Sequence, residues 1–393
     1  MYLAYTDAQL ELQRELRAYF AKLLTPEALA AMAVEGLHSG PVTRQIRLQM
    51  GKDQWLGVGW PAEYGGRAMS ALEQFIFFDE ANRANAPLPL IALNTVGPTI
   101  MTYGTEEQKQ RYLPTILSGE EDWAIGYSEP SSGTDLASLT TRAVRDGDEY
   151  VINGSKIFTS GGDSADFIWL ATRTGPVEDR HRGISVIIVP TTTPGFSAVP
   201  LHIISGGHTT VTYYQDVRVP VSNVILGENN GWQLITSQLN QERVTLSAFA
   251  SRWFAIYEEV VAWARETKTS TGERVVDLPW VQLLLARSYA MIESVRLSNW
   301  KMVAALNSGT LTPADSSATK VLGTETHQKV SQMLLEVLGP DAYLRKGSPG
   351  AVVRGKVELE YRMAVINTFG GGANEIQREI VAWTGLKMTR GAR

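Results

Sequence analysis

The sequence predicts an α+β protein with three parts: an N-terminal helical domain, a middle β-barrel domain and a C-terminal four-helix bundle. Three observations lead to this prediction. At 393 residues, the chain is longer than a single hydrophobic core usually grows. Apolar residues recur at helical spacing towards both ends, and they alternate with polar residues, as in strands, through the middle. We therefore expect domains at 1–120, 121–231 and 232–393.

The N-terminal part begins with a helix signal. Thr6 followed by Gln9 forms a capping box, after which apolar residues recur every three or four positions. Loop signals at 60–66 (WPAEYGG) and 85–90 (NAPLPL) separate the further helical patterns. A last helix, EEQKQRYLPTIL, is followed by a Ser-Gly pair, so the first boundary is placed near residue 120.

The middle part contains several strand patterns. The pair Asn153-Gly154, between EYVI and KIFT, predicts a type I′ hairpin turn. FIWLATRT, GISVIIVP and TVTYYQDVRVP are further strands separated by Gly, Pro and charged turns. Beyond Gly231 the helical period returns. Helices are expected at about 232–266, 276–308, 312–338 and 355–386, and four such helices predict an antiparallel bundle.

Composition excludes several function classes. The net charge is -5 and no Lys/Arg run longer than a pair precedes the KMTRGAR tail, which disfavours nucleic acid. The chain has no Cys, and its five His lack metal-ligand spacing, so no metal site is expected. The first residues, MYLAYTDAQLELQREL, have neither a basic start nor an unbroken apolar run, and no stretch approaches roughly 18 apolar residues. We expect a soluble, cytoplasmic protein that does not bind a membrane.

Glu242 is the first candidate for chemistry. It falls on an apolar helical stripe whose other members are Ile235, Leu239, Leu246, Phe249 and Trp253. Burial without a paired cation raises the pKa of a carboxyl group, which suits a general base. Arg243 points about 100° away on the same helix, so it does not simply neutralise Glu242. The alternative is a structural carboxylate paired with an Arg from another helix.

Two polar or glycine-rich segments are the other candidates. YSEPSSGTD, at 127–135, offers hydroxyls and backbone N–H groups that suit the polar edge and phosphates of a flavin. By itself it also fits an ordinary surface turn. FGGGANEIQR places three glycines in a helical stretch, which permits positive φ and close approach to a ligand, or a plain hinge. No dinucleotide, P-loop or serine-hydrolase motif is present.

Taken in order along nearly the whole chain, five segments resemble the acyl-CoA dehydrogenase family. They are YSEPSSGTD, NGSKIFTSGG, YQDVRVPVSNVILGENNGW, LNQERVTLSA and FGGGANEIQREI. The resemblance implies the three-part fold predicted above. It also implies that FAD binds between the middle and C-terminal domains, and that an acyl-CoA thioester is oxidised at Cα–Cβ to the trans-2-enoyl-CoA. An electron-transfer flavoprotein or a similar acceptor would then reoxidise the flavin.

The resemblance also assigns roles to individual residues. The cofactor-binding positions it implies are Tyr127 and Ser128 at the isoalloxazine ring, Thr134 at the FAD phosphates or CoA, Phe158, Thr159 and Ser160 over the flavin, and Gly371 and Gly372 in the glycine turn. Phe158 stands where many relatives have Trp. Arg243 and Asn240 match the acyl-CoA pocket.

Two departures from the family pattern are informative. Many members carry the catalytic Glu where this chain has Gly371, whereas a minority place it in a Glu-Arg dipeptide, as in Glu242-Arg243. The family segments that reach the FAD of an adjoining subunit are also altered: Thr267 and Ser270 replace one, and Glu336-Val-Leu-Gly-Pro-Asp-Ala replaces the other. The chain resembles the heterotetrameric members that degrade steroid side chains. A homologous subunit in an α2β2 heterotetramer is the expected partner.

The expected reaction is removal of the α-proton of a bound acyl-CoA by Glu242 while the flavin accepts hydrogen from the β-carbon. Two alternatives remain open at this stage. A flavin monooxygenase on the same scaffold would not require a carboxylate near Cα. A non-catalytic subunit that supports a catalytic partner would fit the altered FAD segments.

Overall fold

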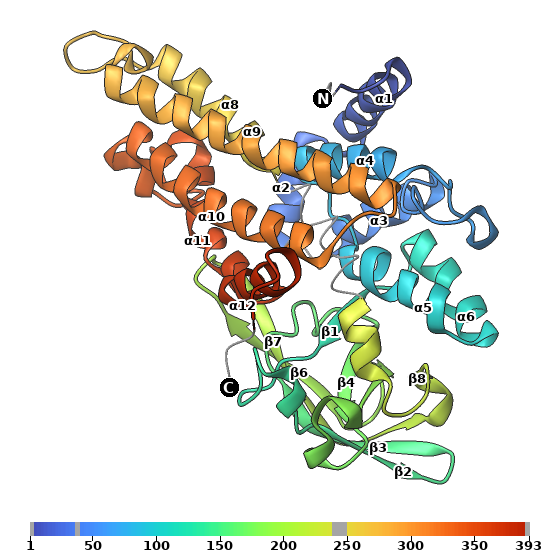
Figure 1. The fold of residues 1–393 in the computed structure, drawn as a ribbon. Coiled ribbons are helices and arrows are strands. Elements are labelled where there is room, and N and C mark those ends of the chain that lie inside the picture. Colours follow the sequence, from blue (N-terminus) through green and yellow to red (C-terminus); the bar gives the residue numbers. More distant parts are fainter. Residues whose placement is uncertain (1–3, 36–39, 238–249, 390–393) are drawn as a thin grey trace. The chain divides into compact units, whose positions relative to one another are not determined.

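The computed structural model describes residues 4–35, 40–237 and 250–389 (Figure 1). By its internal contacts the chain divides into two compact units, each assembled from segments distant in the sequence. The helical unit comprises Met1–Ala21, Ser70–Ala86 and Arg243–Arg393, and the mixed unit comprises Lys22–Met69 and Pro87–Glu242.

The helical unit is built around three long helices. Its α-helices are α1 (Asp7–Leu23), α4 (Ala71–Ala84), α8 (Ala250–Glu266), α9 (Pro279–Asn307), α10 (Pro313–Leu338), α11 (Lys356–Ala364) and α12 (Asn374–Ile380). Helices α8, α9 and α10 pack against one another, and α10 also contacts α11 and α12 (gold to red in Figure 1). The helices expected at 276–308 and 312–338 are confirmed as α9 and α10.

Three of these helices begin with reciprocal capping, one of them α4 through Ser70 and Glu73. Thr6 N donates to Gln9 Oε1 at 3.0 Å and Gln9 N donates to Thr6 Oγ1 at 3.3 Å, which confirms the predicted capping box. Thr312 and Asp315 cap α10 in the same way. Each box satisfies two N–H groups that the first turn of a helix otherwise leaves without acceptors.

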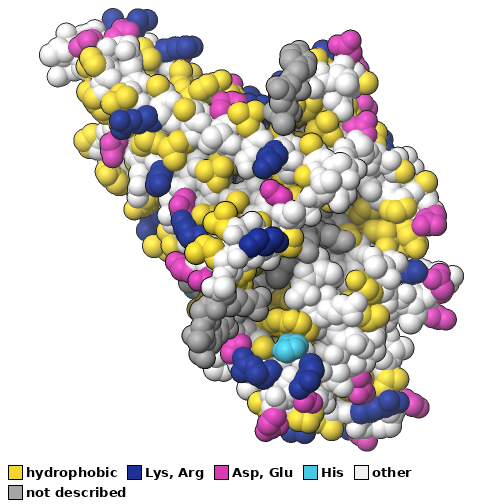
Figure 2. All heavy atoms as spheres, viewed as in Figure 1, with side chains coloured by type: hydrophobic (Ala, Val, Ile, Leu, Met, Phe, Trp, Pro, Cys, Tyr) yellow, Lys and Arg dark blue, Asp and Glu magenta, His cyan; other side chains and the backbone are white. Residues whose placement is uncertain are grey.

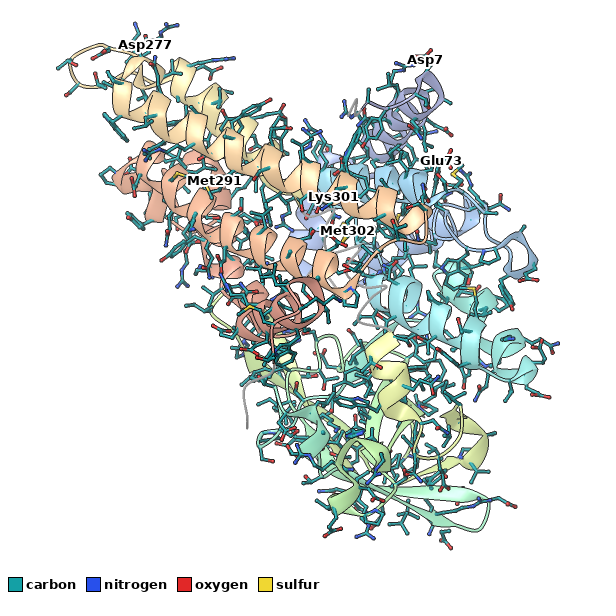
Figure 3. All side chains as sticks on the ribbon, in the orientation of Figure 1. Asp7, Glu73, Asp277, Met291, Lys301 and Met302 are labelled. Atoms are coloured by element: carbon teal, nitrogen blue, oxygen red, sulfur yellow. The ribbon has the colours of Figure 1, made fainter. Side chains whose placement is uncertain are left out.

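Helical periodicity explains how α9 divides its surface between core and solvent. Lys301 and Met302 are adjacent, yet the Lys301 side chain is 74% exposed and Met302 is 1% exposed (Figure 3). Val281, Ile292 and Val295 of α9 join residues of α8 and α10 in the core of the unit. Each large side chain buried there contributes roughly 1.5–3 kcal/mol.

The last expected helix, at 355–386, is interrupted. Helix α11 is followed by the short element η9 (Ile366–Thr368), a glycine turn, α12 and η10 (Val381–Gly385). At the other end of the expected bundle, residues 231–237 are helical and α8 starts at Ala250. The intervening residues 238–249 lie outside the described part of the chain.

The mixed unit combines helices with one sheet. Its α-helices are α2 (Pro26–Glu35), α3 (Pro41–Lys52), α5 (Gly97–Tyr103) and α6 (Glu106–Ser118). Its strands are β1 (Trp123–Gly126), β2 (Arg142–Asp146), β3 (Glu149–Lys156), β4 (Phe167–Arg173), β5 (Ile184–Pro190), β6 (Phe196–His202), β7 (His208–Pro220) and β8 (Val224–Ile225). The strand order is β6-β7-β3-β2-β4-β5-β8, and β1 pairs parallel to β4.

The centre of this sheet is apolar on both faces. Every residue of β4 is buried, and so are all residues of β5 except Pro190. This continuous burial explains why FIWLATR and ISVIIVP carry runs of apolar residues instead of a strict alternation. One of these buried strands, β4, pairs with β1, which directly precedes Tyr127 and Ser128.

The predicted hairpin turn at Asn153-Gly154 is wrong. Both residues lie inside β3, where the register against β7 shifts between Ile152 and Gly154. The turn between β2 and β3 instead contains Gly147, at φ 63°. Gly154 is needed for close packing, because a Cβ there would lie 2.7 Å from the Thr141 Cα.

The described elements follow the predicted order of helices, sheet and helices, whereas the boundaries near 120 and 231 stay predictions. On the face shown in Figure 2, Lys and Arg side chains are interspersed with Asp and Glu. Within the described part of the chain, none of the helices has both the length and the apolar composition needed to span a membrane.

Candidate active site

Tyr127 and Ser128 follow β1 directly. Gly126 ends that strand, and a Cβ on it would lie 2.9 Å from the Leu170 side chain of β4, so glycine allows close pairing there. Trp169 of β4 is fully buried and donates from Nε1 to the Tyr127 phenol oxygen at 3.1 Å. The buried strand therefore fixes the position of the Tyr127 ring.

Phe158, Thr159 and Ser160 follow β3 and lie beside Ser128. The N–H of Ile157 donates to the Ser128 carbonyl at 2.8 Å, which joins the two strand ends. Thr159 is buried and its N–H donates to the Thr210 carbonyl at 3.0 Å. The structure thus brings five predicted residues into one group, which we call the strand-end cluster: Tyr127, Ser128, Phe158, Thr159 and Ser160.

Phe158 combines backbone strain with exposure. Its φ is 63°, in the left-handed region, and its residue surface is 58% exposed. For a residue with a side chain, this backbone costs about 1–2 kcal/mol, and an exposed ring forgoes the stabilisation of burial. Strain of this kind is concentrated at ligand sites. The observation fits a ring that covers a planar ligand such as the isoalloxazine of FAD.

A buried ion pair lies behind the cluster, and sequence reasoning missed it. Lys156, at the end of β3, is fully buried and donates from Nζ to Glu129 Oε1 at 2.8 Å and to the Tyr127 carbonyl at 3.1 Å. Glu129 also accepts hydrogen bonds from the N–H groups of Thr140 and Thr141. A Lys at an inward position of a strand was the signal that could have suggested this pair.

The charge state of Glu129 follows from these contacts. Burial by itself would raise the pKa of this carboxyl group, but Lys156 and the hydrogen bonds from Thr141 lower it to about 2. The carboxylate therefore stays ionised at neutral pH and holds Lys156 against the carbonyl of Tyr127. Through this hydrogen bond the pair fixes the backbone of Tyr127.

Thr134 lies apart from the cluster on an exposed loop. Glu129 and Ser132 exchange backbone hydrogen bonds of 2.7 and 3.1 Å across the SEPSS turn. Thr134 follows this turn and is exposed. No hydrogen bond joins it to the strand-end cluster within the described residues, so the structure leaves its predicted contact with FAD phosphates or CoA a prediction.

The glycine turn belongs to the helical unit. Gly371 and Gly372 have φ of 68° and 104°, so both adopt the positive φ that the sequence suggested. A Cβ on Gly372 would lie 2.5 Å from Gln377 Nε2. Lys320 of α10 donates to the Gly372 carbonyl at 2.7 Å and to Asn374 Oδ1 at 2.7 Å. No motif in the sequence marks Lys320, which is 52 residues from Gly372.

Three predicted residues, Asn240, Glu242 and Arg243, lie outside the described residues. Two members of the apolar stripe around Glu242 are described, and both Ile235 and Trp253 are buried. Within residues 4–35, 40–237 and 250–389, no group of three or more His, Cys, Asp or Glu is arranged to hold a metal ion.

The chain matches three family descriptions that together span most of its length. They are "Acyl-CoA dehydrogenase, N-terminal domain" over residues 6–120, "middle domain" over 124–214 and "C-terminal domain" over 229–386. In chain order, these matches agree with the predicted helical, β and helical parts, and they confirm the fold class.

Individual relatives cover the whole chain. Acyl-CoA dehydrogenase FadE26 of Mycobacterium tuberculosis is 51% identical, and the match covers 100% of both chains. Among solved structures, the "Tcur3481-Tcur3483 steroid ACAD" is 52% identical with a TM-score of 0.94, covering 100% of both chains. The ChsE4-ChsE5 complex from Mycobacterium tuberculosis is 51% identical, also with a TM-score of 0.94 and 100% coverage of both.

The two alternatives left open by the sequence, a monooxygenase and a non-catalytic subunit, gain no support from these matches. Members of the matched family generally use FAD, which fits the strained aromatic and the hydroxyls of the strand-end cluster. Because the relatives exceed 50% identity over the full chain, this protein belongs to the acyl-CoA dehydrogenase family and is an oxidoreductase of that class.

Proposed function

We propose that this chain oxidises the Cα–Cβ bond of a steroid side-chain acyl-CoA, with Glu242 as the catalytic base. The observation that carries the proposal is the glycine turn. Gly371 stands where many relatives carry the base, and its φ of 68° suits a residue without a side chain. A carboxylate must then come from elsewhere, and Glu242 on its apolar helical stripe is the candidate.

In this reaction Glu242 takes the α-proton and the thioester oxygen gains negative charge. A backbone N–H in the glycine turn is able to stabilise that oxygen, and one such donor is worth about 2.7–4 kcal/mol. FAD, when bound, supplies the acceptor for two electrons and the hydrogen from the β-carbon. The product is the trans-2-enoyl-CoA, which has lost one proton to Glu242 and one hydrogen with its electron pair to the cofactor.

The residues that would hold FAD are those of the strand-end cluster. Phe158 would cover the ring, while Ser128, Thr159 and Ser160 would offer hydroxyls or N–H groups to its polar edge. Lys156 and Glu129 keep the backbone of Tyr127 in place for this contact. The remaining proposed contacts with the cofactor and the acyl-CoA come from Thr134, Gly372, Asn240 and Arg243.

Two observations support a steroid acyl group as the substrate: the name of a similar solved structure and the glycine turn at Gly371. One similar solved structure bears the name steroid ACAD. The absence of a side chain at Gly371 also leaves volume for a bulky group. Anaerobic titration with a steroid propanoyl-CoA should bleach the flavin and release a product two hydrogens lighter. Bleaching by short straight-chain acyl-CoA alone would contradict the proposed substrate.

We also propose that a homologous subunit completes the FAD site in an α2β2 heterotetramer. Similar solved structures carry two named chains, as in the ChsE4-ChsE5 complex. The segment that holds Thr267 and Ser270 closes on itself, with Thr269 N donating to the Glu273 carbonyl at 2.8 Å. It lacks the Arg and Phe that reach an adjoining FAD in relatives.

Co-expression with a homologous subunit tests the assembly. We expect equal amounts of the two chains, about one FAD per two chains, and little flavin in this chain purified by itself. A homotetramer with one FAD in every chain would contradict the heterotetramer. An electron-transfer flavoprotein is the proposed acceptor, and it should reoxidise the bleached protein.

A further inference from the structure

One face of α10 carries a row of partly or fully buried polar side chains. Lys320, Thr324 and His327 follow one another at spacings of four and three, so they lie on the same side of the helix. We call this row the α10 polar face. Such side chains are costly to bury unless they have partners, and these three have partners on either side of the glycine turn.

Lys320 makes the most contacts of the row. It is 8% exposed, and its Nζ donates to the carbonyl of Thr368 at 3.1 Å, to that of Gly372 at 2.7 Å and to Asn374 Oδ1 at 2.7 Å. Thr368 precedes the glycines and Asn374 follows them. A lysine ammonium has three N–H donors, so a single side chain ties together both ends of the turn.

The other two members hold the same segment. Thr324 Oγ1 accepts a hydrogen bond from Asn374 Nδ2 at 3.0 Å, which orients the amide towards Lys320. His327 Nδ1 faces Asn367 Nδ2 at 3.4 Å, and its Nε2 lies 2.9 Å from Glu360 Oε2. The α10 polar face therefore contacts residues before and after the three glycines.

The turn needs such an external anchor. Gly371 and Gly372 have access to more backbone conformations than any other residue type, and both are held at positive φ. Inside the turn, Gly370 N donates to the Ile366 carbonyl at 2.8 Å and Gly372 N to that of Phe369 at 3.2 Å. In the described part of the chain, the N–H of Gly371 between them has no hydrogen-bond acceptor.

We propose that Lys320 is a positioning residue that holds this turn so that the Gly371 N–H is available to the thioester oxygen. The inference rests on the proposed function, since it assigns that oxygen its backbone donor. Lys320 acts only through the turn and touches neither the substrate nor the reacting atoms.

The test compares Lys320→Met with Lys329→Met in protein assembled with its homologous subunit. Methionine keeps the length of the side chain and removes the donors, while Lys329 is an exposed residue of the same helix. Single-turnover bleaching by a steroid propanoyl-CoA should slow roughly 10²-fold in Lys320→Met, as expected for misplacement of a reacting group by about 1 Å. Lys329→Met should match wild type.

Two further readouts separate positioning from a general structural role. The flavin content of Lys320→Met should be unchanged, and the isotope effect with the α,α-dideuterated substrate should rise, because proton removal becomes slower relative to other steps. A fall in flavin content in proportion to activity, with an unchanged isotope effect, would reduce Lys320 to a structural residue and overturn the proposal.

Hydrogen exchange of residues 366–374 tests the proposal without any substrate. The amides of this segment should exchange faster in Lys320→Met than in Lys329→Met, and equal exchange would overturn the proposal. If Lys320→Met does not fold, Thr324→Val loosens the same turn through Asn374 and should show a smaller change of the same sign. If no acyl-CoA bleaches the flavin of the wild-type protein, the proposed function is wrong. The hydrogen-exchange comparison would still test the role of Lys320, because it needs no substrate.

Discussion

Lys156 and Glu129 form an ion pair, 2.8 Å between Nζ and Oε1, that is almost completely removed from solvent. The two residues are 27 positions apart and lie directly behind the strand-end cluster. Buried charges are stable only when each has partners. Here Lys156 also donates to the Tyr127 carbonyl of the site, and Glu129 accepts from the N–H groups of Thr140 and Thr141. Breaking this ion pair should therefore both destabilise the sheet and displace Tyr127, one of the candidate flavin contacts.

The first prediction concerns the removal of this pair. Lys156→Met should lower the free energy of unfolding by about 3–5 kcal/mol, because it leaves the Glu129 carboxylate buried without a cation. Urea unfolding measures the change. The double variant Lys156→Met/Glu129→Gln should lose less than the sum of the single variants. As a control, Arg218→Met breaks the exposed pairs with Asp146 and Glu149 and should cost less than about 1 kcal/mol.

The second prediction is a pH dependence. Glu129 has a pKa of about 2 in the folded protein against an ordinary value of 4.5, so its ionised form stabilises the fold above pH 4.5. That contribution, roughly 3 kcal/mol, should be lost as the pH falls from about 4.5 towards 2. Urea unfolding at several pH values should show that the free energy of unfolding falls with pH in wild type, and falls less steeply in Glu129→Gln. Equal slopes would contradict the assigned pKa.

The third prediction concerns the glycine turn. Gly372→Ala introduces a Cβ at φ 104° that meets the buried Gln377 amide at 2.5 Å. It should destabilise the protein by about 1–3 kcal/mol and slow flavin bleaching. Gly323→Ala is a matched control inside α10, where the nearest neighbour of the new methyl lies at 3.8 Å. That variant should be more stable than wild type by roughly 0.5–1 kcal/mol.

The fourth prediction separates strain from ligand contact at Phe158. Phe158→Gly removes the penalty of the left-handed backbone and should leave the free energy of unfolding equal or higher by about 1 kcal/mol. The same change removes the proposed ring cover, so FAD should be retained roughly tenfold more weakly. Equilibrium dialysis measures retention. Val199→Ala, an exposed apolar position of β6, is the control expected to change neither quantity.

Local sequence signals predicted much of the fold. The Thr6–Gln9 capping box and the bounds of α9 and α10 follow from spacing and caps within one helix, where few other contacts compete. The predicted hairpin turn was wrong because the Asn153-Gly154 pair lies inside β3, where Asn153 pairs with Arg142 of β2. Pairing of β3 with β7 continues on both sides of Asn153, where the register shifts, and the turn forms at Gly147 instead.

The site was predicted where its residues are consecutive and missed where its contacts are distant. Tyr127, Ser128 and Phe158 were found as parts of short segments. Lys156 and Lys320 were not, because each meets its partners only after the chain folds, and no spacing in the sequence marks a cation 27 or 52 residues from its acceptor. Asn240, Glu242 and Arg243 stay predictions.

The identity of the base is tested most directly by Glu242→Gln in the assembled, FAD-containing protein. Anaerobic mixing with a steroid propanoyl-CoA should leave flavin content and folding at wild-type values and abolish bleaching, since the amide cannot accept the α-proton. Glu178→Gln, an exposed position, is the matched control and should bleach normally. Bleaching of Glu242→Gln at near wild-type rate would contradict the account.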